Sequence, residues 1–312
     1  MDILCMGELL IDFVALESGV TVGDASGFVK APGGAPANVA VAAARLGLQA
    51  GFIGQVGDDP FGRYLAGVLE ADGVDVRGLR FSPDARTALA FVSLGPGGER
   101  SFVFYRNPSA DMLMRPEDVD LSLVDSCRIF HYGSITLIGE PVRSATLATV
   151  RRAKAGGKLI SYDPNLRMSL WPTAEAAKTG MLLGMQDADV VKVSQEELEF
   201  LTEQSHAGAL WRDGMKLIIV THGADGATLY TPRERFTSPG FAVESVDTTG
   251  AGDSFVAALL SGMLMYGDEF DRHLPEIARF ANAVGAITTT KKGAIPALPT
   301  RQQAEAFLAS QS

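Results

Sequence analysis

Apolar and polar positions change period repeatedly along the chain, and these changes predict strands interspersed with helices. Short apolar runs that end at glycine or at a charged residue predict buried strands, and apolar residues three or four apart predict helices. Strands are expected at residues 3–6, 51–56, 129–132, 158–162, 189–193, 217–221, 227–230 and 241–246. Helices are expected at residues 35–46, 61–71, 140–155, 195–201, 252–266, 275–289 and from 300 onward. This succession is typical of an α/β fold, in which a mostly parallel sheet has helices on both faces.

Two features in the N-terminal third depart from this succession. Residues 88–94 and 101–105 favour strands and flank a glycine-rich turn, which predicts a hairpin. Further strand-like stretches lie within residues 9–30. We expect the segments at about 9–32 and 86–110 to pair as a small separate sheet. Because no repeat or linker divides the chain, residues 1–312 are expected to form one domain with this sheet as an appendage.

Composition narrows the class of protein. Of the 312 residues, 46% are hydrophobic and 21% are charged, as in a globular protein, and the formal net charge of −10 disfavours a nucleic-acid partner. Two cysteines, Cys5 and Cys127, are too few for a disulfide framework and fit a reducing compartment. The longest lipid-like stretch, residues 255–266, is too short to span a bilayer. The N-terminus lacks the regions of a signal peptide, so we expect a cytoplasmic protein without a membrane partner.

The most informative junction between a strand and a helix reads Val-Asp-Thr-Thr-Gly-Ala-Gly-Asp-Ser-Phe, at residues 246–255. Glycine lets a backbone approach a ligand closely, and the amides and dipole at a helix N-terminus favour an anion. Asp253 lies in the first turn of the expected helix. It is either a cap for the free amides or a general base beside bound phosphate, and this motif alone leaves both interpretations open.

Several enzyme classes are excluded because the sequence lacks their motifs. No Lys-Ser or Lys-Thr follows the glycines of the junction at 246–255, so the loop is not a Walker A motif. Phe255 stands where a dinucleotide fingerprint has its third glycine. The four histidines are far apart, neither cysteine has a near partner, and no Gly-x-Ser-x-Gly sequence occurs. These absences exclude a recognisable zinc site and a hydrolase nucleophile elbow.

Two polar residues interrupt apolar segments elsewhere. Asn38 follows a second glycine junction, at residues 32–37, and lies on a helix face made otherwise of alanine and valine. A buried amide needs hydrogen-bonding partners, which a polyhydroxyl ligand provides. Asp12 interrupts Leu-Leu-Ile-Asp-Phe-Val. It belongs either to a half-exposed sheet or to a site that accepts sugar hydroxyls.

Together these motifs resemble the ribokinase-like (PfkB) carbohydrate kinase family. The two family signatures are matched by GGAPANVA at 33–40 and DTTGAGDSF at 247–255. Six further motifs follow the family order and look most like those of fructokinases: ARTALAF (85–91), FYRNPSADML (104–113), FHYGSI (130–135), SYDPNLR (161–167), VTHGADG (220–226) and KKGAIPALPT (291–300). The resemblance covers essentially the whole chain. It implies a three-layer ribokinase-like fold with a mostly parallel central sheet and a small β-sheet lid.

The resemblance also implies a reaction, the transfer of a phosphoryl group from MgATP to a sugar hydroxyl. Asp253 would take the proton of the attacking hydroxyl, and the amides of Gly250, Ala251 and Gly252 would form the anion hole. The substrate contacts implied are Asp12, Gly34, Asn38, Arg106 and Arg167. Because the accepting oxygen lies near Asp253, Asp12 and Asn38 are expected to hold the other end of the sugar.

For the nucleotide and the ions, the resemblance implies three further sets of residues. Nucleotide contacts are expected at Asn165, Lys192, Thr221, Gly223, Gly226 and Asn282. Glu197 matches a position that supports Mg²⁺ through water, the alternative being a solvated helix charge. A monovalent-cation site matches Asp247, Thr249 and Gly293. Ala297 replaces a serine ligand of some ribokinases, which leaves activation by K⁺ open.

Substrate and assembly follow from the same likeness. The motifs at 104–113 and 293–300 favour phosphorylation of D-fructose to fructose 6-phosphate. The alternatives are a 2-keto-3-deoxygluconate kinase, in which Arg106 and Arg167 neutralise a substrate carboxylate, another sugar or nucleoside kinase of the family, or a fructokinase-like binding protein without activity. The lid segments are apolar on both alternations, which favours a homodimer through lid-to-lid packing.

Overall fold

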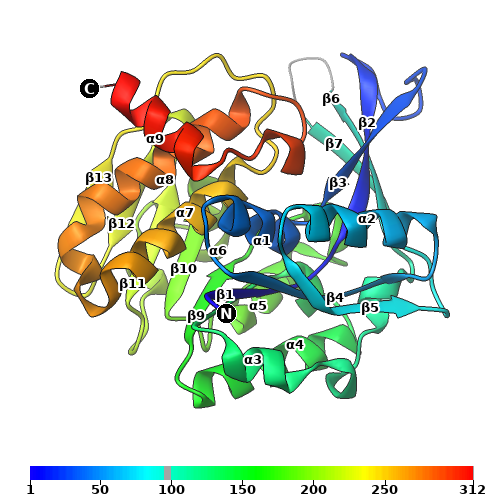
Figure 1. The fold of residues 1–312 in the computed structure, drawn as a ribbon, viewed down its shortest axis with the longest axis horizontal. Coiled ribbons are helices and arrows are strands. Elements are labelled where there is room, and N and C mark those ends of the chain that lie inside the picture. The colour runs from blue at the N-terminus through cyan, green and yellow to red at the C-terminus, as the bar shows by residue number, and fades with distance from the viewer. Residues whose placement is uncertain (95–99, 312) are drawn as a thin grey trace.

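The structure is a computed structural model that describes residues 1–94 and 100–311. Within these residues, nine strands form one sheet in the order β13-β12-β11-β10-β9-β8-β1-β4-β5 (Figure 1). All neighbouring pairs are parallel except β11–β12 and β12–β13. The strands are β1 (Ile3–Met6), β4 (Ala50–Gly57), β5 (Asp75–Ser82), β8 (Ile129–Gly133), β9 (Leu159–Asp163), β10 (Val190–Ser194), β11 (Leu217–Thr221), β12 (Ala227–Tyr230) and β13 (Arg235–Ser238).

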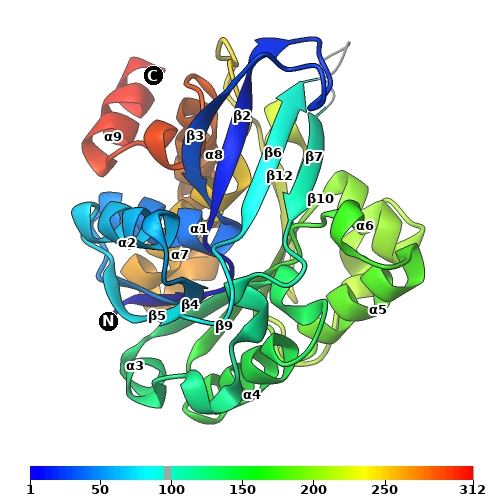
Figure 2. The same cartoon turned by 90° about the vertical axis from the view of Figure 1, so that its right-hand side faces the viewer.

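Helices cover both faces of this sheet, as Figure 2 shows. One layer contains α1 (Ala35–Arg45), α2 (Pro60–Ala71), α7 (Ala251–Tyr266) and α8 (Leu274–Thr289), and α9 (Arg301–Ser310) packs against α8. The opposite layer contains α3 (Leu121–Ser126), α4 (Val142–Ala155), α5 (Ala174–Gly184) and α6 (Gln195–Thr202). The three-layer arrangement predicted from the sequence is confirmed.

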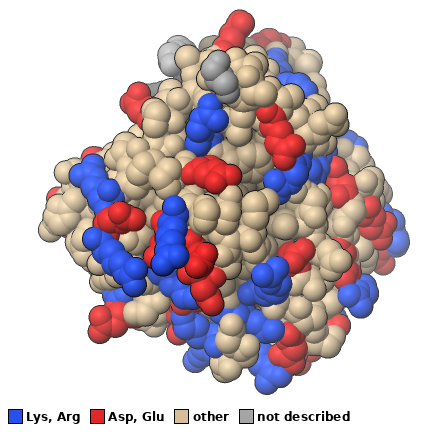
Figure 3. All heavy atoms as spheres, turned by 60° about the vertical axis from the view of Figure 1, so that its left-hand side comes forward, with Lys and Arg blue, Asp and Glu red and all other residues tan. Residues whose placement is uncertain are grey.

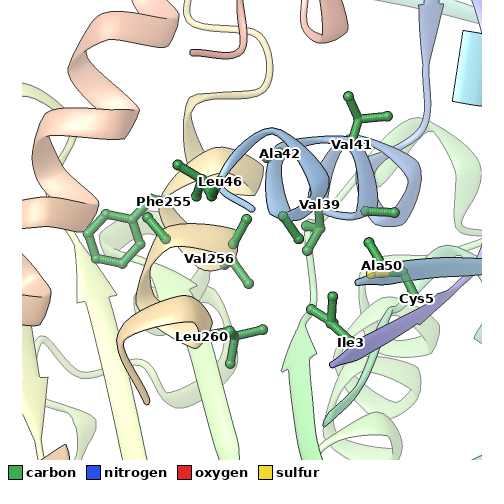
Figure 4. Packing of buried hydrophobic residues seen from close by; sticks show 14 of the residues in the cluster. Ile3, Cys5, Val39, Val41, Ala42, Leu46, Ala50, Phe255, Val256 and Leu260 are labelled. Atoms are coloured by element: carbon green, nitrogen blue, oxygen red, sulfur yellow. The ribbon is translucent and has the colours of Figure 1, made fainter. Parts of the chain in front are cut away.

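The apolar side chains of the central strands pack alternately against the two helical layers. In β1, Ile3 and Cys5 belong to the core under α1 and α7, whereas Leu4 and Met6 belong to the core under α3 and α4. A strand buried on both faces therefore has no polar alternation. Figure 4 shows side chains of α1 and α7 packed together above Ile3 and the neighbouring strands.

Two surface properties bear on possible partners. Among residues 1–94 and 100–311, no helix combines the length and the apolar character needed to cross a bilayer. The apolar residues 255–266 belong to α7, which is buried along most of its length. On the face drawn in Figure 3, acidic and basic side chains are interspersed and neither sign covers the face.

A second, smaller sheet forms the lid, in the order β3-β2-β6-β7. Its strands are β2 (Leu10–Ser18), β3 (Phe28–Gly33), β6 (Leu89–Leu94) and β7 (Arg100–Tyr105), and it stands apart from the large sheet (Figure 2). Buried polar contacts stabilise the base of the lid, where its strands join the rest of the protein. The amide and hydroxyl of Thr87 donate to Asp59 at 2.8 and 2.9 Å, and Arg106 Nε lies 2.7 Å from Asp111 Oδ2. The predicted turn at 95–99 lies outside the described residues.

One predicted strand is wrong. Residues 241–246 form no strand, and the sheet edge is β13 instead, which pairs with β12. Pro239 and Gly240 separate the two segments. The apolar residues 241–243 line a cavity instead of pairing with a neighbouring strand. The sequence pattern also missed β5, α3 and α5, whose amphipathic signals are weak or short.

Candidate active site

The glycine-containing junction at residues 246–255 forms the N-terminus of α7. Gly250 is the N-cap, with φ of 80°, and a Cβ at this position would lie 3.0 Å from the Ala294 side chain. Glycine is therefore required both for its left-handed backbone and for space. The first amides of a helix have no acceptor within the helix. Here the Ala251 amide donates to the Thr248 carbonyl at 3.3 Å, in the loop before α7, and the anion hole at 250–252 stays a prediction.

Asp253 lies in the first turn of α7 and is 7% exposed. No side chain caps α7, and the Asp253 carboxylate instead accepts a hydrogen bond from Asn38 Nδ2 at 2.7 Å. Asn165 Nδ2 lies 3.5 Å from its other oxygen. The cap interpretation is therefore wrong, and side chains from two distant segments of the chain, Asn38 and Asn165, orient this carboxylate.

The environment of Asp253 suits a base at neutral pH. Burial raises the pKa of its carboxyl to about 6, although the hydrogen bond from Asn38 opposes the rise. Asp163 raises the pKa further, and Lys192 and Arg167 lower it. At pH 7 the Asp253 carboxyl is mostly ionised, and its pKa is closer to the solution pH than that of an exposed aspartate. General base catalysis requires both properties.

Two cavities meet at this helix terminus. One of about 390 Å³ lies between the lid and α7, and the other, of about 590 Å³, lies between the β11–β12 turn and α8. Thr248 and Gly252 line both cavities. The first is lined by the predicted residues Asp12, Gly34, Asn38, Asn165, Arg167, Lys192, Glu197, Thr249, Gly250 and Asp253. The second is lined by the predicted residues Thr221, Gly223, Gly226, Ala251 and Asn282.

Two predicted substrate residues occupy unexpected places. Arg106 lines neither cavity, because its guanidinium is buried against Asp111 at the base of the lid. Asn38 lines the first cavity, but its amide lies against Asp253. Only Nδ2 of Asn38 is used in this way, and its Oδ1 is buried without a partner among the described residues, so contact between Asn38 and the sugar stays a prediction. Asp12, in the lid strand β2, also lines this cavity.

Lys192 places a positive charge beside the glycines. Its Nζ lies 3.0 Å from Asp163 Oδ2 and 3.1 Å from the point that a Cβ of residue 252 would occupy. Burial alone lowers the pKa of Lys192, but Asp163 and Glu197 outweigh burial and raise it. The ammonium group therefore stays charged at the junction of the cavities.

Glu197 is buried rather than solvated. Its two oxygens accept the amides of Leu166 and Ser194 at 2.7 and 2.8 Å, so it closes a capping box at α6 and ties the 163–167 loop to that helix. The neighbouring Glu196 is exposed on the same cavity. Among the described residues, no group of three or more His, Cys, Asp or Glu side chains is placed to hold a metal directly. Glu196 and Glu197 are the carboxylates on this part of the cavity wall, and support of Mg²⁺ through water stays a prediction.

The residues predicted for a monovalent cation lie together. Asp247 Oδ1 accepts the amide and the hydroxyl of Thr249 at 3.0 and 2.7 Å, and Asp247 Oδ2 accepts the amide of Gly293 at 2.8 Å. These bonds fix the loop that precedes the anion hole against the segment after α8. The loop holds this shape through Asp247.

Sequence analysis missed several lining residues, among them Glu8, Phe102, Phe104, Ser194 and Glu196. Glu8 could have been found, because a charged residue directly after a buried strand lies at the sheet edge where ligands bind. Phe102 and Phe104 alternate along β7 and face the cavity, with ring centroids 5.8 Å apart. Only the pairing of the lid strands reveals which alternate residues face inward.

Comparison with known proteins identifies the family. A model of the pfkB family carbohydrate kinase matches residues 1–301. The chain belongs to the pfkB family of carbohydrate kinases. As a pfkB kinase it is a phosphotransferase, and the resemblance noted in the sequence is confirmed.

Individual relatives share the whole length of this pfkB kinase. Probable fructokinase-3 of Arabidopsis thaliana is 54% identical over 316 residues, covering 99% of this chain and 92% of the relative. Fructokinase of Xylella fastidiosa with bound ATP superimposes with a TM-score of 0.92 at 36% identity, covering 99% and 98% of the two chains. A double mutant of Vibrio cholerae O395 fructokinase, with fructose, ADP and potassium ion bound, gives a TM-score of 0.89 at 38% identity, covering 98% of each chain.

Proposed function

We propose that this pfkB kinase transfers the γ-phosphoryl group of ATP to the 6-hydroxyl of D-fructose. The observation that carries the proposal is the meeting of two cavities at Thr248 and Gly252, with Asp253 beside the junction. In-line transfer requires the accepting oxygen, the base and the anion hole within reach of one point. The cavity on the lid side is of a size for a hexose, and the other has the apolar walls that suit a nucleobase.

The residues of the chain divide the chemistry among them. Asp253 accepts the hydroxyl proton as the bond to phosphorus forms, and Asn38 holds its carboxylate in place. The amides of Gly250, Ala251 and Gly252 and the ammonium of Lys192 stabilise the charge that develops on the transferred group. Glu196 and Glu197 would hold Mg²⁺ through water beside ATP, and the ion would supply further neutralisation of phosphate charge.

The choice of a neutral ketohexose rests on the relatives and on one arginine. The three relatives described above are named fructokinases or probable fructokinase, and the structure of one of them contains fructose and ADP. A kinase for 2-keto-3-deoxygluconate needs positive charge for the carboxylate of its substrate. Of the two arginines considered for that role, Arg167 lines the cavity and Arg106 is engaged by Asp111. This arrangement favours a neutral sugar.

One assay tests the substrate and one tests the product. ADP release is measured with fructose, ribose, adenosine and 2-keto-3-deoxygluconate, and we expect the highest kcat/KM with fructose. A higher value with another substrate contradicts the assignment, and no release with any of them supports a binding protein without activity. Phosphorus-coupled NMR of the product is expected to show coupling to the protons on carbon 6. Coupling to the carbon 1 protons means that the sugar binds the other way round.

Assembly as a homodimer through the lid is part of the proposal. Phe13, Phe91, Val103 and Tyr105 lie on the outer face of the lid, where Val103 is 41% and Tyr105 is 64% exposed. The Phe13 and Phe91 rings stack at 5.1 Å, and Phe91 contacts Tyr105 at 5.3 Å. Exposed apolar patches of this kind mark interaction surfaces.

A monovalent-cation site and a reducing compartment are also proposed. Asp247, Thr249 and the loop at Gly293 are proposed as the region of a monovalent cation. The structure of the Vibrio relative contains a potassium ion, which supports the presence of such a site. Both cysteines are buried as free thiols, which suits a reducing, cytoplasmic setting.

A further inference from the structure

Among the carboxyl groups that line the sugar-side cavity, that of Glu8 has no role in the reaction described above. Glu8 follows β1 by two residues, is 2% exposed, and lines the same cavity as Asp12, Asn38 and Asp253. Its Oε1 accepts the amide of Ala35, the first residue of α1, at 2.9 Å. A buried carboxyl group is rare unless it is paired with a cation or serves a function.

Glu8 supplies the cap that α1 lacks. The N-cap residue is Gly34, which has no side chain to accept an amide, and no side-chain cap is found there. The two segments are in close contact, since a Cβ on Gly34 would lie 2.3 Å from the Glu8 carbonyl oxygen. A carboxylate at a helix N-terminus stabilises the first turn through both the hydrogen bond and the helix dipole.

The capped turn leads directly to the base. The amide of Asn38 donates to the Gly34 carbonyl at 2.8 Å, and Asn38 Nδ2 donates to Asp253 Oδ2 at 2.7 Å. Asn38 is therefore fixed at one end by the turn that Glu8 caps and at the other by the base. We propose that Glu8 is a positioning residue that, through the Ala35 amide, holds the first turn of α1 so that Asn38 orients Asp253.

The chemistry of Glu8 makes this role dependent on pH. Burial raises the pKa of Glu8 to about 7, while its own amide, the Ala35 amide and Arg106 lower it and Asp111 raises it. Ionised Glu8 is the stronger acceptor, so the first turn is held most firmly above pH 7. Protonation weakens the cap, and the effect reaches Asp253 through Asn38.

The same burial gives the opposite trend for stability. The pKa of Glu8 in the folded chain, about 7, lies above its ordinary value of 4.5. Folding therefore favours the protonated form, and the contribution of Glu8 to stability declines as the pH rises from about 4.5 to about 7. Above pH 7 the ionised group destabilises the fold and assists the reaction. If Glu8 had only a structural role, its ionisation would change stability without raising kcat.

Glu8→Gln tests the proposal, with the exposed Glu70→Gln on α2 as a control for the same chemical change. Glutamine keeps the acceptor for Ala35 but does not ionise. We expect kcat about fivefold below that of the wild type at pH 8, as for loss of a charge at a helix N-terminus. The difference should vanish near pH 6, and KM for ATP should not change. Glu8→Ala, which leaves the amide without an acceptor, should lose more activity at every pH.

Melting temperature is the second readout and needs no substrate. Glu8→Gln is expected to melt above the wild type at pH 8 and together with it near pH 4.5. A variant with the kcat and pH profile of the wild type overturns the proposal, and so does a Glu8→Gln variant that is less stable at pH 8. The proposal rests on the proposed kinase reaction, but the two fail separately. If another sugar replaces fructose, the same comparison is made with that sugar and the melting result stands.

Discussion

Replacing Asn38 with alanine isolates what the structure does to the base. The substitution removes the 2.7 Å hydrogen bond to Asp253 Oδ2, while burial of the carboxylate persists. This hydrogen bond lowers the pKa of Asp253, which burial raises to about 6. Without it, the ionised form loses its nearest donor, so we expect the base to need a higher pH.

The size of the change follows from the strength of that bond. A hydrogen bond to a charged group contributes about 1.5–3 kcal/mol, and about 1.4 kcal/mol corresponds to one pH unit. The midpoint of the acid limb of the kcat profile should therefore move upward by about one to two pH units. At pH 7, the ionised fraction falls from about nine-tenths to between about one-half and one-tenth, which lowers kcat about two- to tenfold.

The assay is kcat against pH between 5 and 9, with sugar and ATP saturating, because Asn38 also lines the sugar cavity. Asn165→Gly is the matched control. Asn165 approaches the other oxygen at only 3.5 Å and has a φ of 48°, which glycine adopts without strain. It should move the acid limb much less. An Asn38→Ala profile that keeps the wild-type midpoint, or a loss that does not recover at pH 9, refutes the reasoning.

Two further predictions concern turnover and assembly. Asp253→Ala should lower kcat by about 10²- to 10⁴-fold while a fluorescent ATP analogue binds as before, and turnover within about threefold of the wild type contradicts the base assignment. Light scattering at tens of micromolar should give twice the chain mass, and Tyr105→Lys on the exposed lid face should shift the mass toward one chain. A wild-type chain that stays monomeric at that concentration argues against the lid interface.

The sequence predicts the fold well because burial on both faces of a sheet leaves a strong local signal. The apolar run of β1 and the alanine-rich start of α1 are examples, since each is buried along its length. The prediction of a strand at 241–246 is wrong because its apolar residues pack at a cavity wall, and no local pattern distinguishes a cavity wall from a neighbouring strand. Whether such a segment becomes a strand depends on hydrogen bonding to a neighbouring strand, which comes from a distant part of the chain.

The site is predictable where function requires an unusual residue in a particular local setting. Asp253 after two glycines and Asn38 on an alanine face both show in the sequence, and their contact, across 215 residues, does not. The engagement of Arg106 by Asp111 is hidden in the same way. An arginine that lies in a family motif looks like a ligand contact until the structure shows which carboxylate it meets.

The three polar contacts at the base of the lid also determine how the lid can change shape. Glu8 with Ala35, Asp59 with Thr87 and Arg106 with Asp111 hold the ends where the lid strands leave the body. Rotation of the whole lid as a rigid plate would break all three, at about 1.5–3 kcal/mol for each bond to a charged group. The ends of the lid strands are therefore anchored to the body of the protein, and a change of the lid's orientation as one unit requires these contacts to open. A sugar bound beneath the lid would meet Asp12 close to this anchored end, because Asp12 lies two residues after the first residue of β2, Leu10.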